Sequence, residues 1–443
     1  MSIQISDHFS YKKLIQFTLP TIAMMIFTSI YGVVDGIFVS NFVGSDAFAA
    51  VNLIMPALMI FGSIGFMIGT GGSALVSKCL GEGKEQKAKE IFSMLITVVI
   101  VVGAVLSVIG FVGIRGIVQL LGADETMMEY CVVYGRILLL GNVPFMLQNT
   151  FQSFLVVAER PQMGLKISIA AGVTNMVLDF VFVYLLRWGV VGAGLATVVS
   201  QLVGSVIPFG YFMKKNASPL QMVKFEFDKR DLLKSCMNGS SEMLTNLSMS
   251  LVNMLYNFQL IKFAGADGVA AYGIIMYVSF IFVGTYLGYS IGSAPIVSYH
   301  YGAGNHDELK NLFKKSLILI VIIAGSLTAV AELNSGLLAG IFVSYDAELL
   351  VMTTTAIRLY SLSYLVSGIN IFASAFFTAL NDGLVSAVIS FLRTLVFQII
   401  MIFLLPALFG LEGIWLSILA AEILGLSVSV FCFKKYAKKY HYV

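Results

Sequence analysis

The sequence predicts an all-α integral membrane protein in which twelve transmembrane helices form two six-helix bundles related by a parallel internal repeat. Three observations support this prediction: an apolar composition, twelve long apolar runs, and short motifs that recur at a constant spacing. Of the 443 residues, 58% are hydrophobic and only 12% are charged, and the mean hydropathy is +0.91. Because a soluble protein carries about 25% charged residues to face water, this composition excludes a soluble enzyme. The 34 phenylalanines and 19 tyrosines exclude a disordered chain.

Each expected helix is an apolar run of about 20 residues or more, because the hydrocarbon core of a bilayer is about 30 Å thick. The runs are continuous and do not alternate, which excludes a membrane barrel. The first run contains Asp35 and lacks a small-residue cleavage site, so we expect a membrane helix and not a cleaved signal peptide. The spans, in order, are 14–40, 50–77, 91–114, 130–157, 164–187, 190–213, 232–261, 269–298, 316–342, 351–379, 384–409 and 411–433.

The distribution of lysine and arginine predicts the orientation of these spans. If both termini are cytoplasmic, 21 of the 27 basic residues lie on the cytoplasmic side, as the positive-inside rule requires. We therefore expect a multi-pass protein of the cytoplasmic (plasma) membrane with both ends inside. The six exceptions are Arg115, Arg136, Arg187, Lys262, Arg358 and Arg393.

An internal repeat relates the two halves of the chain, because three separated segments of the first half recur in the second half at one constant offset. Since each half contains six spans, equivalent helices cross the membrane in the same direction, an arrangement typical of alternating-access carriers. The expected domains are an N-terminal lobe (1–213), a cytoplasmic connector (214–231) and a C-terminal lobe (232–443). The matching segments are 42–50 with 263–271, 77–83 with 298–304, and 189–195 with 410–416.

Charge and cysteine usage exclude other classes. A net charge of +3 is too small to indicate nucleic-acid binding. Cys79, Cys131, Cys236 and Cys432 lie far apart without CxxC spacing, so neither a disulfide framework nor a zinc cluster is expected.

Polar residues inside the spans of the first half predict a cation site. Asp35, Asp179 and Thr197 each lie roughly 10 Å below the outer face, and Asn175 lies one turn deeper than Asp179 on the same face. Such an acidic residue costs roughly 2.5–3.5 kcal/mol in a membrane helix, which favours a functional role. Oxygen ligands suit a hard cation, and two neighbouring carboxylates can also hold a proton. The structural alternative is that each aspartate pairs with an arginine such as Arg136 or caps a helix.

The second half lacks this cluster, because the repeat counterparts of the two aspartates are Tyr256 and Ile400. Instead Glu242 and Arg393 lie at a similar depth from the cytoplasmic side and could pair. Glu242 is thus a candidate contact for a cationic substrate, a candidate second proton site, or a structural partner of Arg393.

Four motifs together resemble a known family: Leu19-Pro20, the segment 34–39 (VDGIFV), Asn175-x-x-x-Asp179 and the segment 192–201 (GAGLATVVSQ). With the paired six-helix halves, the sequence is similar to the MATE (multidrug and toxic compound extrusion) transporters, and its pattern resembles the bacterial MepA-like branch. This resemblance implies a V-shaped pair of bundles that exchanges external Na⁺ or H⁺ for a cytoplasmic organic cation.

The resemblance also implies site residues. The cation site would comprise Asp35, Asn175, Asp179 and Thr197, with the carbonyl of Ala193 as a further ligand, and these residues would hold the metal if the ion is Na⁺. Glu242 falls where related transporters carry a functional acidic residue. One departure is that the span 351–379 contains no Asp or Glu, which argues against the second-half ion site of some relatives.

The expected function is therefore a secondary multidrug antiporter that is not an enzyme, has no cofactor, and functions as a monomer in the lipid bilayer. Its partners would be small organic cations and drugs, and the coupling ion Na⁺ or H⁺. A lipid-linked oligosaccharide flippase of the same superfamily is the first alternative, although it would need a more basic cavity. An intramembrane enzyme would need a motif such as HExxH, which is missing. A passive channel stays open as a further alternative.

Overall fold

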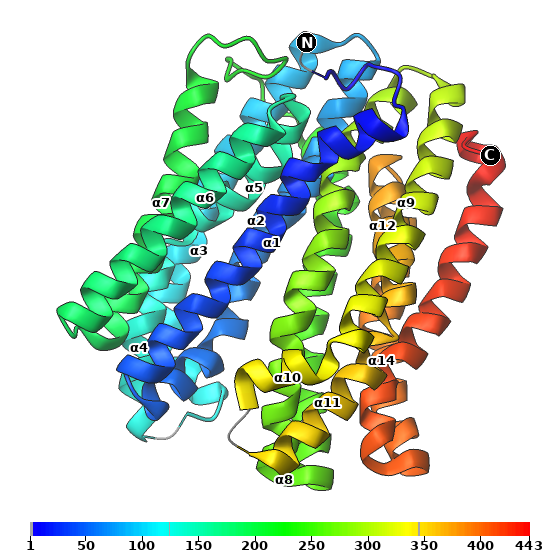
Figure 1. Cartoon of the computed structure of the whole chain (residues 1–443). Helices are drawn as coiled ribbons and strands as arrows, with labels where there is room; N and C mark the ends of the chain where they lie inside the picture. The colour runs from blue at the N-terminus through cyan, green and yellow to red at the C-terminus, as the bar shows by residue number, and fades with distance from the viewer. Residues whose placement is uncertain (1–2, 124, 344–345) are drawn as a thin grey trace.

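The computed structural model describes residues 3–123, 125–343 and 346–443, and all regular structure within these ranges is helical. The helices run roughly along the long axis of the molecule (Figure 1), which confirms the all-α prediction. The first half contains α1 (Tyr11–Phe42), α2 (Ser45–Gly81), α3 (Glu85–Leu120), α4 (Glu125–Leu140), α5 (Asn142–Val157), α6 (Pro161–Asp179), the π-helix η1 (Phe180–Leu185) and α7 (Gly189–Met213). The second half contains α8 (Lys229–Gly302), α9 (His306–Leu333), α10 (Ser335–Val343), α11 (Ala347–Ser361), α12 (Tyr364–Ala379), α13 (Gly383–Phe391), the π-helix η2 (Leu392–Val396) and α14 (Phe397–Tyr440).

The number of membrane crossings follows from how the long helices bend. Within the described residues, eight helices are long and apolar enough to span a membrane, and the bent pairs α4–α5 and α11–α12 raise the number to ten. Two long helices are interrupted by glycines with positive φ, Gly265 in α8 and Gly410 in α14. Division at Gly410 splits 383–440 into two spans, and division at Gly265 separates the more polar segment 229–264. Both divisions fall between spans expected from the sequence, 232–261 and 269–298 at Gly265, and 384–409 and 411–433 at Gly410.

The internal repeat is visible in the backbone as well as in the sequence. Three pairs of helix-boundary glycines share a positive φ, a conformation that costs residues with a Cβ atom more than it costs glycine. The two members of each pair are separated by the same offset as the matching sequence segments. The pairs are Gly44 with Gly265, Gly83 with Gly304, and Gly189 with Gly410.

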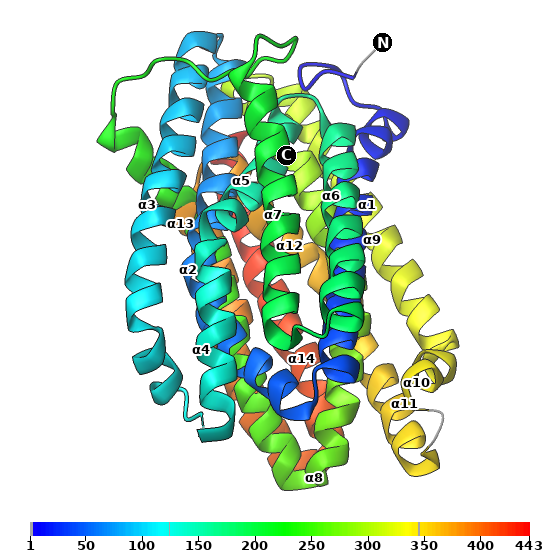
Figure 2. The same cartoon turned by 90° about the vertical axis from the view of Figure 1, so that its left-hand side faces the viewer.

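The two halves share one core at one end of the molecule and have separate cores at the other. We call the end that carries both chain termini the terminal face, which lies uppermost in Figure 1, and the opposite end the far face. Near the terminal face a continuous core joins Phe92 and Phe154 of the first half to Phe313 and Phe376 of the second. Toward the far face, one core lies within 39–193 and another within 252–415. The halves therefore pack together at the terminal face and diverge toward the far face, as Figure 1 shows. In Figure 2, turned by 90°, α7 of the first half lies in front of α14 of the second.

Backbone contact between α2 and α8 seals the terminal face. A Cβ atom added to Gly71 would lie 2.0 Å from the carbonyl oxygen of Ser235, and one added to Gly81 would lie 2.0 Å from that of Tyr299. Small residues permit such close approach of membrane helices. Both ends of α8 thus contact the same end of α2, which requires α8 to double back at Gly265.

The N-terminal segment also crosses the junction between the halves. The backbone amide of Ile5 donates to Glu159 Oε1 of the first half at 2.9 Å. The amide of Phe9 donates to Glu308 Oε1 of the second half, also at 2.9 Å. Because Ile5 and Phe9 are buried, this segment fastens the two halves together at the terminal face.

Candidate functional site

The predicted cation site lies beside a cavity of about 340 Å³ within the first half. Helices α1, α2, α4, α5, α6 and α7 all contribute to its wall. Asp35, Asn175 and Thr197 line the cavity, whereas Asp179 lies behind its wall with no exposed surface. A larger hollow of about 530 Å³ lies at the terminal face among charged residues and contains none of the predicted site residues.

The structure brings the two aspartates close together. Asp35 is on α1 and Asp179 is the last residue of α6, yet their carboxyl groups lie close together, and Asn175 lies beside Asp35. The π-helix η1 starts immediately after Asp179, and such bulges are frequent at functional sites. The predicted residues Asp35, Asn175 and Asp179 therefore meet from helices that lie far apart in sequence.

The oxygens of this site lack hydrogen-bond donors. Asp35 Oδ1, Asn175 Oδ1 and both carboxylate oxygens of Asp179 are buried and accept no hydrogen bond. Two ionised carboxylates cannot donate to each other, and buried acceptors without partners cost free energy. A hard cation, or a proton shared by the carboxyl groups, would satisfy these oxygens. The donor set thus fits either Na⁺ or H⁺.

The arginine alternative is wrong. Arg136 lies with its guanidinium 5.2 Å from the centre of the Phe111 ring, and among the described residues neither aspartate forms an ion pair. Neither aspartate caps a helix with its side chain: Asp35 lies inside α1, and Asp179, at the N-cap position of η1, forms no capping hydrogen bond.

Thr197 and Ala193 interact with each other. The Thr197 hydroxyl donates to the Ala193 carbonyl at 3.0 Å, one turn earlier in α7. This bond uses the hydroxyl proton and leaves the oxygen lone pairs of Thr197 free to face a cation. Tyr134 approaches Thr197 from α4 and lies near both aspartates.

The sequence analysis identified Asn175 and Thr197 but missed the other neutral residues of this site. Tyr31 and Gln148 interact with each other, Tyr31 also lies near Asp35, and Gln201 has a buried oxygen without a donor. Uncharged amides and phenols cost little in a membrane helix, so they carry no signal comparable to that of a carboxylate. On α5 the available signal was the spacing of the amides, because Gln152 follows Gln148 by four residues and Asn149 by three. The polar neutral residues that line the cavity are Thr28, Tyr31, Tyr134, Asn142, Gln148, Asn149, Gln152, Asn175, Thr197, Ser200 and Gln201.

In the second half, the suggested pair of Glu242 and Arg393 is not formed. Arg393 instead forms a buried ion pair with Glu422, with its Nε 2.9 Å from Oε1 and 3.0 Å from Oε2. Glu242 is half-buried on α8 near Arg393 and forms no ion pair within the described residues. The pairing differs because α14 turns back at Gly410 and brings Glu422 beside η2. Glu242 therefore lies near a positive charge without forming an ion pair within the described residues.

Comparison with curated proteins finds bacterial drug exporters. The chain is 24% identical over 417 residues to the multidrug export protein MepA of Staphylococcus saprophyticus, which covers 93% of this chain and 91% of that protein. It is also 24% identical over 418 residues to MepA of Staphylococcus aureus strain MSSA476, with 93% and 91% coverage.

Comparison with solved structures confirms the fold. A crystal structure of MATE in complex with MaL6 has a TM-score of 0.92 at 22% identity and covers 98% of each chain. A structure described as the outward-facing conformation of a multidrug resistance MATE family transporter also has a TM-score of 0.92 at 22% identity, with 98% coverage of each chain. A MOP superfamily transporter from Pyrococcus furiosus has a TM-score of 0.91 at 22% identity, covering 98% of this chain and 97% of that one.

The family comparison matches the chain twice, once in each half. The MatE description fits residues 20–181 and 243–404, so the two copies correspond to the internal repeat read from the sequence. Together these matches extend over more than half of the chain and include Asp35, Asn175 and Asp179. This polytopic membrane protein therefore belongs to the MatE family.

Proposed function

We propose that this protein is a secondary multidrug antiporter that exports organic, often cationic and aromatic compounds in exchange for Na⁺ or H⁺. The drug-export part is supported by the MepA relatives, which are multidrug export proteins. The observation that supports ion coupling is the contact between Asp35 and Asp179, whose buried oxygens lack donors. A site of this kind binds a cation or proton because the bound ion reduces the repulsion between two carboxylates.

The orientation assigns each face a role. The terminal face carries the connector and most lysines, so it is the cytoplasmic side by the positive-inside rule. The diverging far face is then external, and the structure corresponds to an outward-open state of the transport cycle. In this state the coupling ion enters from outside and reaches Asp35 through the cavity of the first half.

Movement of α1 links ion binding to the second half. A cation between Asp35 and Asp179 draws α1 toward α6, and Pro20 removes one backbone hydrogen bond from α1 so that this helix can bend. The helix also packs closely on α8, where a Cβ added to Gly288 would lie 2.5 Å from Ile22 Cα. An ion that binds one conformation of α1 more tightly shifts the equilibrium between the outward and inward states.

Glu242 provides a counter-charge for the exported compound. Its carboxyl group is half-buried on α8 and forms no ion pair among the described residues, unlike the neighbouring Arg393. A cationic drug that reaches α8 would supply the missing positive charge. Because this site and the ion site lie in different halves, drug and ion affect each other through the conformation of the whole chain.

Transport in proteoliposomes tests the proposal. Dye efflux is measured with a Na⁺ gradient alone and with a pH gradient alone, for the parent, Asp35→Asn and Asp179→Asn. We expect one gradient to drive efflux by the parent, and both variants to fall to the rate of protein-free vesicles. The matched control is Asp267→Asn, which removes an exposed carboxylate and should transport like the parent.

Two results would contradict the proposal. Ion-driven efflux by both aspartate variants at the parental rate would remove the coupling role of the site. Parental transport that needs no gradient, or that moves a lipid-linked oligosaccharide and no dye, would favour a channel or the flippase alternative instead.

A further inference from the structure

The second half contains a buried ion pair where the first half has its cavity. Glu422 is the repeat counterpart of Gln201, because each lies at the same distance along the chain from an equivalent glycine, Gly410 or Gly189, both with a φ of 60°. Gln201 lines the cavity of the first half. Glu422 therefore occupies the corresponding wall of the second half.

A glycine contact identifies a second pair of equivalent residues. A Cβ atom on Gly204 would lie 2.6 Å from Cδ of Gln148, and one on its repeat counterpart Gly425 would lie 3.0 Å from Nδ2 of Asn370. Gln148 lines the cavity of the first half, and Asn370 takes the same place in the second. Two cavity-lining glutamines thus correspond to Asn370 and Glu422.

In the second half this place is filled by hydrogen-bonded side chains. Asn370 Nδ2 donates to Glu422 Oε2 at 2.7 Å and to its carbonyl oxygen at 2.9 Å, and Ser429 donates to Asn370 Oδ1 at 2.8 Å. Arg393 Nε donates to both carboxylate oxygens of Glu422 at 2.9 and 3.0 Å. A Cβ on Gly425 would lie 3.2 Å from Arg393 Cγ, so the arginine reaches the space that corresponds to the cavity. Glu422 is only 2% exposed, and each of its carboxylate oxygens accepts at least one hydrogen bond.

We propose that Arg393 is a built-in cation that permanently fills the second-half counterpart of the cation cavity, so that Glu422 binds neither Na⁺ nor a proton during transport. A guanidinium keeps its charge at every physiological pH. Because it is tethered beside the carboxylate, it does not lose translational freedom on pairing, as a free ion does. Ion exchange is then confined to the first half, a statement that rests on the function proposed above for Asp35 and Asp179.

Removal of the Arg393 guanidinium should leave a site beside Glu422 that binds an exchangeable cation. Arg393→Gln leaves Glu422 buried without a positive partner, a state that is strongly unfavourable unless a cation or proton binds. The test uses the full-length protein carrying Asp179→Asn, so that the first-half site does not contribute. Thermal unfolding of the purified protein is measured in NaCl against choline chloride, and at pH 5 against pH 7.

The expected result is a cation response that depends on both residues of the pair. If the Arg393→Gln protein binds Na⁺, a tenfold excess of Na⁺ over its dissociation constant should stabilise the folded state by roughly 1.4 kcal/mol and raise the unfolding temperature by about 3 °C. If it binds a proton instead, the change from pH 7 to pH 5 should raise the unfolding temperature by a similar amount. Arg393→Gln combined with Glu422→Gln should lose the response. Arg358→Gln is the matched control, because this exposed arginine donates to Ser335 and has no acidic partner within the described residues.

Either of two results would overturn the proposal. The first is a folded Arg393→Gln protein whose unfolding responds to Na⁺ and pH no more than the double variant does. The second comes from Glu422→Gln with the first-half site intact, which covers the case that Arg393→Gln does not fold. For Glu422→Gln, the external Na⁺ or H⁺ concentration that gives half-maximal transport should equal that of the parent. A tenfold shift of this concentration would show that Glu422 takes part in ion exchange. Failure of the Asp179 variant to affect transport would contradict the proposed function and leave the unfolding test unchanged.

Discussion

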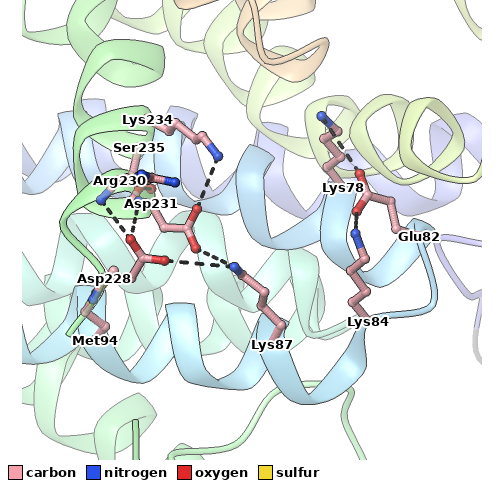
Figure 3. Close-up of polar contacts among 10 residues, drawn as sticks. All are labelled: Lys78, Glu82, Lys84, Lys87, Met94, Asp228, Arg230, Asp231, Lys234 and Ser235. Carbon is pink, nitrogen blue, oxygen red and sulfur yellow. Dashed lines mark hydrogen bonds and ion pairs between the residues drawn. The ribbon is translucent and has the colours of Figure 1, made fainter. Parts of the chain in front are cut away.

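The contact of Lys87 with Asp231 provides a direct test of how the two halves close at the terminal face. Lys87 Nζ on α3 lies 3.0 Å from Asp231 Oδ2 on α8, and Lys234 Nζ lies 3.4 Å from Oδ1 of the same carboxylate (Figure 3). The Lys87 contacts, this one and a longer one of 4.0 Å to Asp228 Oδ2, join the two halves, whereas Lys234 and Asp231 belong to one helix. Lys87→Gln therefore removes a bond between the halves, and Lys234→Gln is a control with the same charge change and the same acceptor.

The magnitude follows from the exposure of the partners. The Asp231 side chain is 6% exposed but that of Lys87 is 49% exposed, so water screens the pair and its value is that of a surface ion pair, about 0.2–1 kcal/mol. Lys234 still compensates Asp231 in the variant, so no unpaired buried charge adds to the loss. The ratio of separated to closed terminal faces should therefore rise by a factor of about 1.4 to 5 in Lys87→Gln.

Pulsed electron paramagnetic resonance measures this ratio. Spin labels at Gln86 on α3 and Asp307 on α9, both exposed, report the distance between the halves once the native cysteines are replaced. We expect the long-distance population to grow in Lys87→Gln and to stay at the parental level in Lys234→Gln. Equal distributions in the parent and Lys87→Gln, or equal changes in both variants, would refute the reasoning.

Two further predictions concern the same face. Gly239→Ala should lower the unfolding temperature and reduce transport, because its Cβ would lie 1.9 Å from the Met67 carbonyl oxygen and cost about 1–3 kcal/mol of overpacking. The control is Gly113→Ala, whose Cβ meets nothing within 4 Å and which should leave both properties unchanged or slightly stabilise the protein. Equal effects of the two substitutions would contradict the packing argument. The backbone amide of Arg230 holds the pKa of the Asp228 carboxyl below its usual range. This helix cap therefore stabilises the folded protein above the usual pKa of aspartate and is lost as the pH falls through the lowered value. The unfolding temperature should be less sensitive to acidification from pH 5 to about 2 in Asp228→Ala than in the parent, and equal sensitivity would exclude this role of the cap.

Much of the site was predictable because charge is costly in a membrane. Asp35 and Asp179 were identifiable from apolar surroundings alone, and counting residues from the span ends placed them at one depth. The same cost argument identified Glu242 and Arg393. It could not identify Gln148 or the other neutral residues of the cavity wall, since their presence in a span carries a small penalty.

Pairing across the bundle was the part that the sequence did not reveal. Depth is set by position along a helix, but contact also depends on how each helix is rotated. Spans that are apolar on every side do not indicate that rotation. Arg393 therefore pairs with Glu422 and not with Glu242. The sequence shows all three charged residues but does not show which carboxylate the arginine contacts.

The amino-acid sequence by itself predicted the helical class and the repeat, which the structure and the family match confirm, and it singled out the acids that lie inside the helices. These properties depend on local hydropathy, on glycine at positive φ and on spacing along the chain. The tertiary structure alone decided that the halves share a core at the terminal face, that Asp179 lies behind the cavity wall, and that the matching place in the second half holds an ion pair. Those features depend on side chains that meet from distant helices, and only the packed bundle fixes which faces meet.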